Sequence, residues 1–218
     1  MIILFDLDGT LIDSTDAILE SFQSSFDTHN LVHPKDEDIK ALIGYPLDIM
    51  SKKLGIPKDI IWDFVASYKT NYRKIFTQKT VLLKNAREAV ITASKFATLG
   101  IVTTKTGEYS QILMEHFELM DYFDVLIGRE HVQNPKPHAE PILKAIEKLN
   151  LKTKEIWMIG DTKLDIISAK NAGVNSIAVL SGYGTHETLN EVANIILPNT
   201  FKAVKHLENR KISHTHNS

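Results

Sequence analysis

The part of the chain after residue 80 alternates helical patterns with short apolar runs. Runs such as 99–103, 124–127 and 156–160 are apolar almost throughout, and segments with helical spacing of apolar residues separate them. Continuous apolar runs of this length are typical of strands buried on both faces, and the intervening helices fit the crossovers of a parallel sheet. The pattern predicts an α/β fold with a Rossmann-like parallel sheet covered by helices.

The first residues predict one more strand of this sheet, and this strand ends in two acids. The apolar run 1–5 is followed by Asp6 and Asp8, with Leu7 between them. Side chains alternate along an extended chain, so the two carboxylates point to the same side and need a cation or a shared proton. We expect a metal there. The alternative is a polar turn in which the acids bond to nearby backbone groups.

The segment between this strand and residue 81 has helical patterns only. In open α/β sheets ligands bind at the carboxyl ends of strands, so an insertion that leaves from this strand end is placed to cover the site. The predicted organisation is an α/β core from residues 1–13 and 81–210, a helical cap from residues 14–80, and a disordered tail from residues 211–218.

Composition excludes several classes of protein. The 218 residues carry a net charge of −2 with no block of like charge, so nucleic acid and membrane surfaces are not predicted partners. The absence of cysteine excludes disulfides and thiolate chemistry. No apolar run is long enough to span a membrane, and the N-terminus lacks a signal-peptide layout. We expect a cytoplasmic monomer or homodimer.

Polar groups suited to an oxyanion follow later strands. Thr103 ends the run 99–103 and Thr104 follows it. A hydroxyl and backbone N–H groups can bind phosphate there, although threonine is also simply a good strand residue. Lys136 lies between Pro135 and Pro137, which fix the backbone and present its ammonium at a defined point. The alternative for Lys136 is an ordinary surface lysine.

A second acidic pair follows the apolar run 156–160. Asp161 comes at the end of this predicted strand, and Asp165 lies four residues further on, one turn into the next helix. Two carboxylates that converge at one strand-to-helix junction suit Mg²⁺, which prefers oxygen ligands. The alternative is that Asp161 or Thr162 only caps the helix.

In this order the motifs resemble those of the haloacid dehalogenase superfamily of phosphohydrolases. The resemblance rests on Asp6-Leu7-Asp8-Gly9-Thr10, Thr103, Lys136 and Gly160-Asp161 to Asp165. A helical cap inserted after the first motif is also the family's arrangement. Gly44-Tyr45-Pro46, Lys136-Pro137-His138 and Gly182-Tyr183-Gly184 resemble the phosphoglycolate-phosphatase-like group. Thr104 departs from that group, which often has Asn at this position.

The resemblance implies a role for each residue of the first motif and of the phosphate site. Asp6 attacks phosphorus and forms an aspartyl-phosphate, while Asp8 protonates the leaving oxygen and then activates water. Thr103 and Lys136 bind the phosphoryl oxygens. Thr104 contacts phosphate through its backbone N–H.

The resemblance also implies the metal ligands. Mg²⁺ is expected on Asp6, Asp161 and the backbone carbonyl of Asp8, with Asp165 supporting the site. Tyr45 is a candidate substrate contact if its turn faces the site, and core packing is the alternative.

The expected activity is Mg²⁺-dependent hydrolysis of a small phosphorylated metabolite. Phosphoglycolate is the first candidate, and pyrophosphate is another. One alternative is a phosphotransferase of the β-phosphoglucomutase type, which needs a basic motif in the cap for a second phosphate, and none is clear beside Gly44. The other is a non-catalytic binding protein, for which the complete set of motif residues has no explanation.

Overall fold

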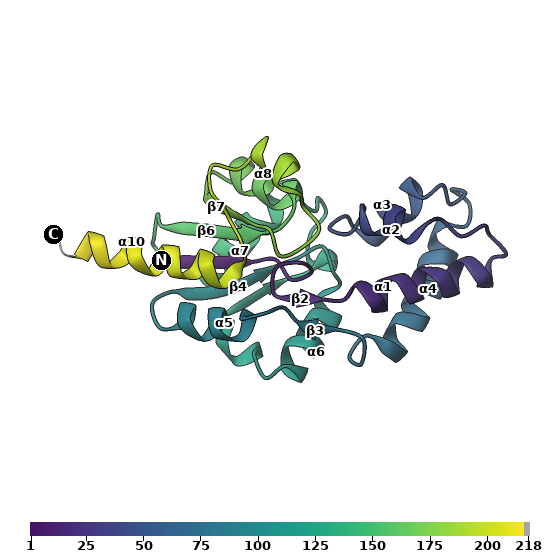
Figure 1. The fold of residues 1–218 in the computed structure, drawn as a ribbon, viewed down its shortest axis with the longest axis horizontal. Coiled ribbons are helices and arrows are strands. Elements are labelled where there is room, and N and C mark those ends of the chain that lie inside the picture. Colours follow the sequence, from purple (N-terminus) through teal and green to yellow (C-terminus); the bar gives the residue numbers. More distant parts are fainter. Residues whose placement is uncertain (216–218) are drawn as a thin grey trace.

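The computed structural model describes residues 1–215 and is centred on a six-stranded sheet (Figure 1). The strand order is β5-β4-β1-β6-β7-β8, and every pairing is parallel. The strands are β1 (Ile2–Phe5), β4 (Thr98–Val102), β5 (Val125–Ile127), β6 (Ile156–Gly160), β7 (Asn175–Val179) and β8 (Ile196–Leu197). This sheet confirms the predicted α/β fold.

Strand β1 lies at the centre of the sheet and positions the site. Leu4 pairs with Gly100 of β4 on one side and with Met158 of β6 on the other. The chain runs from β1 to β4 and β5, then returns across β1 to β6. Because the strand order reverses here, the carboxyl end of β1 lies at a topological switch point, where ligands bind in folds of this kind.

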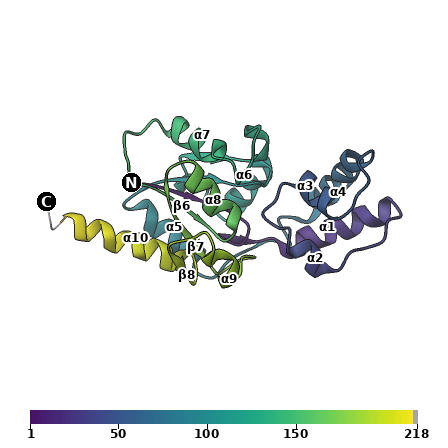
Figure 2. The same cartoon turned by 90° about the horizontal axis from the view of Figure 1, so that it is seen from above.

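Helices cover both faces of the sheet, as Figure 2 shows. On one face Ile2 and Leu4 pack with residues of α7, and on the other Ile3 and Phe5 belong to the cluster that includes α5 and α10. The alternation explains why all of β1 is apolar. The core helices are α5 (Ala86–Ser94), α6 (Gly107–His116), α7 (Glu140–Leu149), α8 (Lys163–Asn171), α9 (His186–Asn190) and α10 (Thr200–Thr215). Short 3₁₀ turns span Met120–Tyr122 and Arg129–His131.

Four helices between residues 14 and 80 form a separate group, which we term the helical lobe. They are α1 (Thr15–Thr28), α2 (Asp36–Lys40), α3 (Leu47–Lys53) and α4 (Ile61–Ile75). Aromatic rings join α1 to α4, with the ring of Phe22 4.9 Å from that of Tyr68. Figures 1 and 2 show the lobe beyond the carboxyl end of β1. Its role as a cap stays a prediction.

A two-stranded pairing joins the lobe to the sheet region, and the sequence did not predict it. Strands β2 (Ile12–Asp13) and β3 (Val81–Leu82) are antiparallel, with Ile12 opposite Leu82. They are the two chain segments that enter and leave the lobe. Strands this short have no periodicity to detect, because their pairing is set by the meeting of distant segments.

The C-terminal segment corrects one expectation. Helix α10 continues to Thr215, so residues 211–215, which we expected to be disordered, are helical. Ala203, Val204 and Leu207 are buried, and α10 packs on α5. The last turns carry few apolar residues, and there Lys211 Nζ donates to the Phe96 carbonyl at 2.9 Å. The remainder of that predicted tail, residues 216–218, lies outside the described residues.

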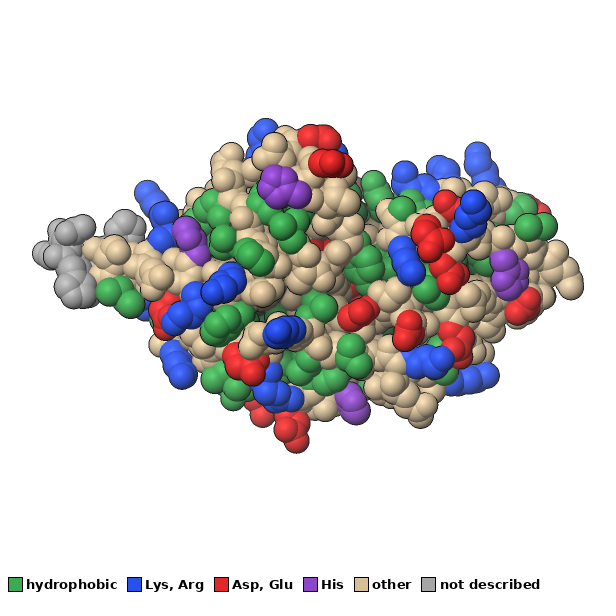
Figure 3. Space-filling view, viewed as in Figure 1, with side chains coloured by type: hydrophobic (Ala, Val, Ile, Leu, Met, Phe, Trp, Pro, Cys, Tyr) green, Lys and Arg blue, Asp and Glu red, His purple; other side chains and the backbone are tan. Residues whose placement is uncertain are grey.

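Charges of both signs are interspersed on the face of the molecule drawn in Figure 3. This mixture agrees with the small net charge. Within residues 1–215, no helix combines the length and apolar character that crossing a membrane requires.

Candidate active site

Three carboxylates converge at the carboxyl ends of the central strands. Asp6, Asp161 and Asp165 are buried, and each offers an oxygen within 4.8 Å of the others. Asp6 follows β1 and Asp161 follows β6; these strands are parallel neighbours, so their ends meet at one edge. Asp165 reaches the same point from the first turn of α8. We term these residues the acidic cluster.

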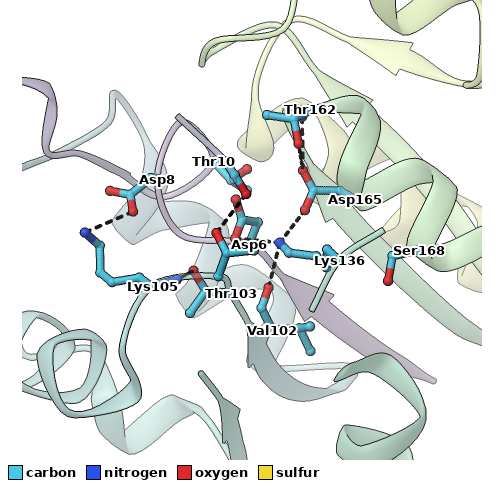
Figure 4. Close-up of polar contacts among 12 residues, drawn as sticks. Asp6, Asp8, Thr10, Val102, Thr103, Lys105, Lys136, Thr162, Asp165 and Ser168 are labelled. Atoms are coloured by element: carbon cyan, nitrogen blue, oxygen red, sulfur yellow. Dashed lines mark hydrogen bonds and ion pairs between the residues drawn. The ribbon is translucent and has the colours of Figure 1, made fainter. Parts of the chain in front are cut away.

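Lys136 lies against this cluster. Its Nζ donates to Asp6 Oδ1 at 2.9 Å, to the Val102 carbonyl at 3.1 Å and to Asp165 Oδ1. Figure 4 shows the ammonium between the two carboxylates. Lys136 is 3% exposed, so it is not a surface lysine. The structure thus brings together Asp6, Lys136 and the pair Asp161 and Asp165, which the sequence analysis identified in three separate segments.

The electrostatics of the cluster fit a divalent cation. Burial raises the pKa of Asp6 to about 7, although Lys136 opposes this shift. Burial, and then the charges of Asp165 and Asp6, raises the pKa of Asp161. Burial lowers the pKa of Lys136, but Asp165 and Asp6 outweigh it and raise that pKa overall. Three carboxylates beside one ammonium carry excess negative charge, which an oxygen-liganded cation such as Mg²⁺ neutralises.

The chain passes so close to the Asp161 side chain at two positions that both must be glycine. A Cβ on Gly9 would lie 2.2 Å from Asp161 Oδ2, and one on Gly182 would lie 2.1 Å from it. Gly9 also has a positive φ of 82°. The same Oδ2 accepts the backbone N–H of Tyr183 at 2.8 Å, and Oδ1 accepts the Thr10 hydroxyl at 3.1 Å. Only glycine permits this close approach.

Asp165 has two roles. Its Oδ2 accepts the backbone N–H of Thr162 at 3.0 Å and the Thr162 hydroxyl at 2.7 Å, a capping box at the start of α8. Its other oxygen accepts from Lys136. Of the two residues suggested as caps, Thr162 is the N-cap and Asp161 is not. Asp165 takes part in the capping box and also belongs to the acidic cluster.

Asp8 faces a different partner from Asp6. Its Oδ2 lies 3.1 Å from Lys105 Nζ, and its Oδ1 accepts the hydroxyl of Ser14. Strand β1 ends at Phe5, so strand alternation does not continue to Asp8. Figure 4 shows each carboxylate beside its own lysine. The acidic cluster does not include the Asp8 side chain, and the metal contacts expected of Asp8 stay a prediction.

Sequence reasoning missed Lys105 and Ser14. Lys105 Nζ also donates to the hydroxyl of Tyr72 at 2.7 Å, and its side chain is only 9% exposed. Ser14 directly precedes α1, but its side chain makes no capping bond there. Two threonines before a lysine do not indicate that the lysine is enclosed, and the Tyr72 hydroxyl that contacts it comes from the lobe, 33 positions away in sequence.

The two threonines after β4 have separate partners. Thr103 is buried, its Oγ1 accepts the N–H of Lys105 at 3.2 Å, and Figure 4 shows it between Asp6 and Lys105. The Thr104 hydroxyl donates to the Gly44 carbonyl at 2.8 Å, a contact between the core and the lobe. Side-chain contact of Thr104 with phosphate therefore competes with a bond it already makes.

A cavity of about 190 Å³ separates the lobe from the core beside Asp8. Tyr45 lines it, half-buried, with Lys53 Nζ 4.9 Å from its ring centroid. Lys69, Lys105 and Arg129 place positive charge on the wall, and Asp8 and Asp48 place negative charge there. The rest of the wall is mostly apolar and aromatic.

Comparison with known proteins relates the chain to one family of hydrolases. The model of the family described as haloacid dehalogenase-like hydrolase matches residues 3–179. The pyrophosphatase PpaX of Bacillus cereus is 34% identical over 182 residues, which cover 81% of this chain and 82% of that protein.

Solved structures show the same fold over nearly the whole chain. A haloacid dehalogenase-like family protein from Streptococcus pneumoniae has a TM-score of 0.84 and 27% identity, and the match covers 94% of this chain and 97% of that one. A predicted phosphoglycolate phosphatase from Haemophilus somnus has a TM-score of 0.86 with 23% identity, covering 94% and 97%. The second likeness concerns the fold alone.

Proposed function

The chain belongs to the haloacid dehalogenase-like hydrolase family, and from this premise we propose a metal-dependent phosphatase of small phosphorylated compounds with Asp6 as nucleophile. The observation that carries the proposal is the placement of Asp6 beside Lys136 and within the acidic cluster. A carboxylate that attacks a phosphate needs positive charge around both, which Lys136 supplies and which a cation held by the acidic cluster would add.

The reaction proceeds in two steps on this chain's own residues. A carboxylate oxygen of Asp6 bonds to phosphorus as the bond to the leaving oxygen breaks, and Asp8 gives its proton to that oxygen. Water then attacks phosphorus, Asp8 takes the water proton, and the bond to Asp6 breaks. Lys136 holds the phosphoryl oxygens against Asp6, and Thr103 offers a hydroxyl beside them.

Asp6, Asp161 and Asp165 would hold the metal, and Mg²⁺ is the ion proposed. The three buried carboxylates offer oxygen ligands only, as this hard cation prefers. When bound, the cation offsets negative charge between the nucleophile and the phosphate. The Asp8 carbonyl completes the proposed ligand set.

Pyrophosphate is the first substrate to test. Relatives about one-third identical bear the name pyrophosphatase, and Lys69 and Arg129 place cations on the wall of the cavity beside Asp8. Phosphoglycolate is the second, supported by the sequence motifs Gly44-Tyr45-Pro46 and Gly182-Tyr183-Gly184. We propose that the helical lobe is a cap, residues 14–80, over the core of residues 1–13 and 81–210.

Phosphate release from a panel of pyrophosphate, phosphoglycolate and other small phosphate esters tests the proposal. The assay is run with Mg²⁺, after removal of metal with EDTA, and after Mg²⁺ is restored. Activity should fall by at least about 10³-fold without metal and return with it, since the cation supplies several kcal/mol of charge stabilisation. Turnover that survives EDTA unchanged contradicts the metal assignment, and no phosphate release from any compound contradicts the function.

A further inference from the structure

We propose that Lys105 is a positioning residue for Asp8, and that Tyr72 of the helical lobe completes this role by holding the Lys105 ammonium. The inference rests on the proposed function, in which Asp8 moves protons to the leaving oxygen and from water. It assigns a role in the reaction to a contact between the lobe and the core.

The first observation is the burial and pairing of Lys105. Its ammonium lies 3.1 Å from Asp8 Oδ2 and donates to Tyr72 at 2.7 Å. Burial lowers the pKa of Lys105, but Asp8 and then Tyr72 raise it overall, so the side chain is charged. An ammonium in so enclosed a position is costly unless it is paired. Lys105 and Asp8 therefore fix each other's orientation.

The second observation is the rigidity of Tyr72. This residue is 1% exposed, and its ring stacks between those of Tyr68 and Phe76 at centroid distances of 5.6 and 5.3 Å. The Lys105 ammonium is also 4.8 Å from the Tyr72 ring centroid. Tyr68 and Tyr72 lie on α4 and Phe76 follows its last residue, so the position of the Tyr72 hydroxyl depends on the position of the lobe.

The third observation is that Asp8 receives donors from two sides. Lys105 approaches Oδ2 from the segment after β4, and Ser14 approaches Oδ1 from the start of the lobe. Each proton transfer requires an Asp8 oxygen within hydrogen-bond reach of the leaving oxygen or of water. Misplacement by about 1 Å costs roughly 100-fold in rate. Asp8 is thus correctly aimed only while the lobe lies against the core.

A matched pair of tyrosine variants tests the inference. Tyr72→Phe removes only the hydroxyl that holds Lys105. Tyr109→Phe removes a similar contact between the lobe and the core, the hydroxyl that accepts Arg73 Nε at 2.7 Å, without touching Lys105 or Asp8. Both residues line the same cavity. With the substrate turned over fastest by the unmodified enzyme, we expect kcat to fall about threefold to tenfold for Tyr72→Phe and less than about twofold for Tyr109→Phe.

Lys105→Met gives the larger effect and a test of how it arises. It should lower kcat by about tenfold to 100-fold with little change in KM, since the stem remains and only the aim of Asp8 is lost. In an Asp8→Asn background the same substitution should change the rate less than about twofold. Single-turnover measurement with enzyme in excess quantifies these slow variants, and circular dichroism confirms that each is folded.

The outcomes separate this inference from the proposed function. Equal losses for Tyr72→Phe and Tyr109→Phe, or an unchanged rate for Lys105→Met, overturn the positioning role. An equal effect of Lys105→Met with and without Asp8 shows a purely structural lysine. If the unmodified enzyme releases no phosphate from any compound, the proposed function itself has failed.

Discussion

The buried Lys136 and the largely enclosed Lys105 each pair with one aspartate of the first motif, and their surroundings differ. Lys136 contacts Asp6, Asp165 and the Val102 carbonyl, all from the α/β core. Lys105 contacts Asp8 on one side and Tyr72 of the helical lobe on the other. The groups around Lys136 lie at the ends of β1 and β4 and at the start of α8. The groups around Lys105 come together only where the lobe packs on the core.

The surroundings of Asp6 come from the core alone, whereas those of Asp8 depend on the helical lobe. The acidic cluster holds the proposed nucleophile in a framework that is independent of the lobe. The surroundings of Asp8 include a cavity wall, a lobe hydroxyl and the first residue before α1. We therefore expect the largest losses of turnover and stability from changes at the Asp6 side, and smaller losses, dependent on how the lobe meets the core, from changes at the Asp8 side.

The largest effect is expected for Asp6→Asn. Loss of the nucleophile should reduce turnover by more than about 10⁴-fold, measured as phosphate release. The protein should stay folded, since burial already disfavours the charged form of Asp6. Asp16→Asn, at an exposed acid in the first turn of α1, is the matched control and should keep its activity. Comparable turnover in the two variants contradicts the nucleophile assignment.

The second-largest effect is expected for removal of Lys136. Lys136→Met leaves the buried carboxylates of Asp6 and Asp165 without their cation, which should cost about 3–5 kcal/mol of unfolding free energy. Urea unfolding in EDTA measures this loss. Lys105→Met should lose less, because Asp8 keeps the Ser14 hydroxyl and is nearer to solvent. A greater loss for Lys105→Met reverses the proposed contrast between the two lysines.

Arg129→Met probes the cavity on the Asp8 side. Arg129 lines the cavity, and its Nε lies 4.0 Å from Asp48 of the lobe. Loss of this cation should raise KM for pyrophosphate about tenfold, since charge-assisted contacts to anions contribute about 1.5 kcal/mol or more, and kcat should change little. Arg87→Met, which removes a half-buried arginine bonded to the Phe117 carbonyl, serves as the control. A fall in kcat without a rise in KM would contradict substrate binding by Arg129 and indicate a role in the chemical step.

The smallest effect on stability is expected at Glu130, which holds the backbone two residues after Lys105. Both Glu130 oxygens accept the N–H of Gly107 at the start of α6, at 2.9 and 2.8 Å. Burial raises the pKa of Glu130, but this bond and others outweigh it and lower that pKa. Its charge therefore stabilises the fold above the pKa of the unfolded chain and ceases to do so as pH falls through the lower, folded value.

Glu130→Gln tests this pH dependence. At neutral pH the variant should lose at most about 1 kcal/mol, because solvent screens the exposed carboxylate. The difference from the unmodified protein should narrow as pH falls from 6 to about 4, where Glu130 begins to protonate. Urea unfolding at the two pH values measures it. A difference that widens toward low pH contradicts the sign of the pKa shift.

Much of the fold was readable in the sequence for a local reason. Apolar runs such as 156–160 need no distant partner to be recognised as buried strands, and their alternation with helices predicts a parallel sheet. The pair β2 and β3 and the last turns of α10 were missed. Their structure depends on the meeting of distant segments and on contacts such as that of Lys211 with Phe96.

The sequence by itself determined which residues make the acidic cluster. Asp6 and Asp161 each follow a strand, and parallel strands bring their carboxyl ends to one edge whatever covers the sheet. Only the tertiary structure decided the partner of Asp8. Lys105 and Tyr72 are separated by 33 positions, and neither is distinguished by its neighbours in sequence. Their contact exists because the helical lobe packs against the core, and such packing leaves no local pattern.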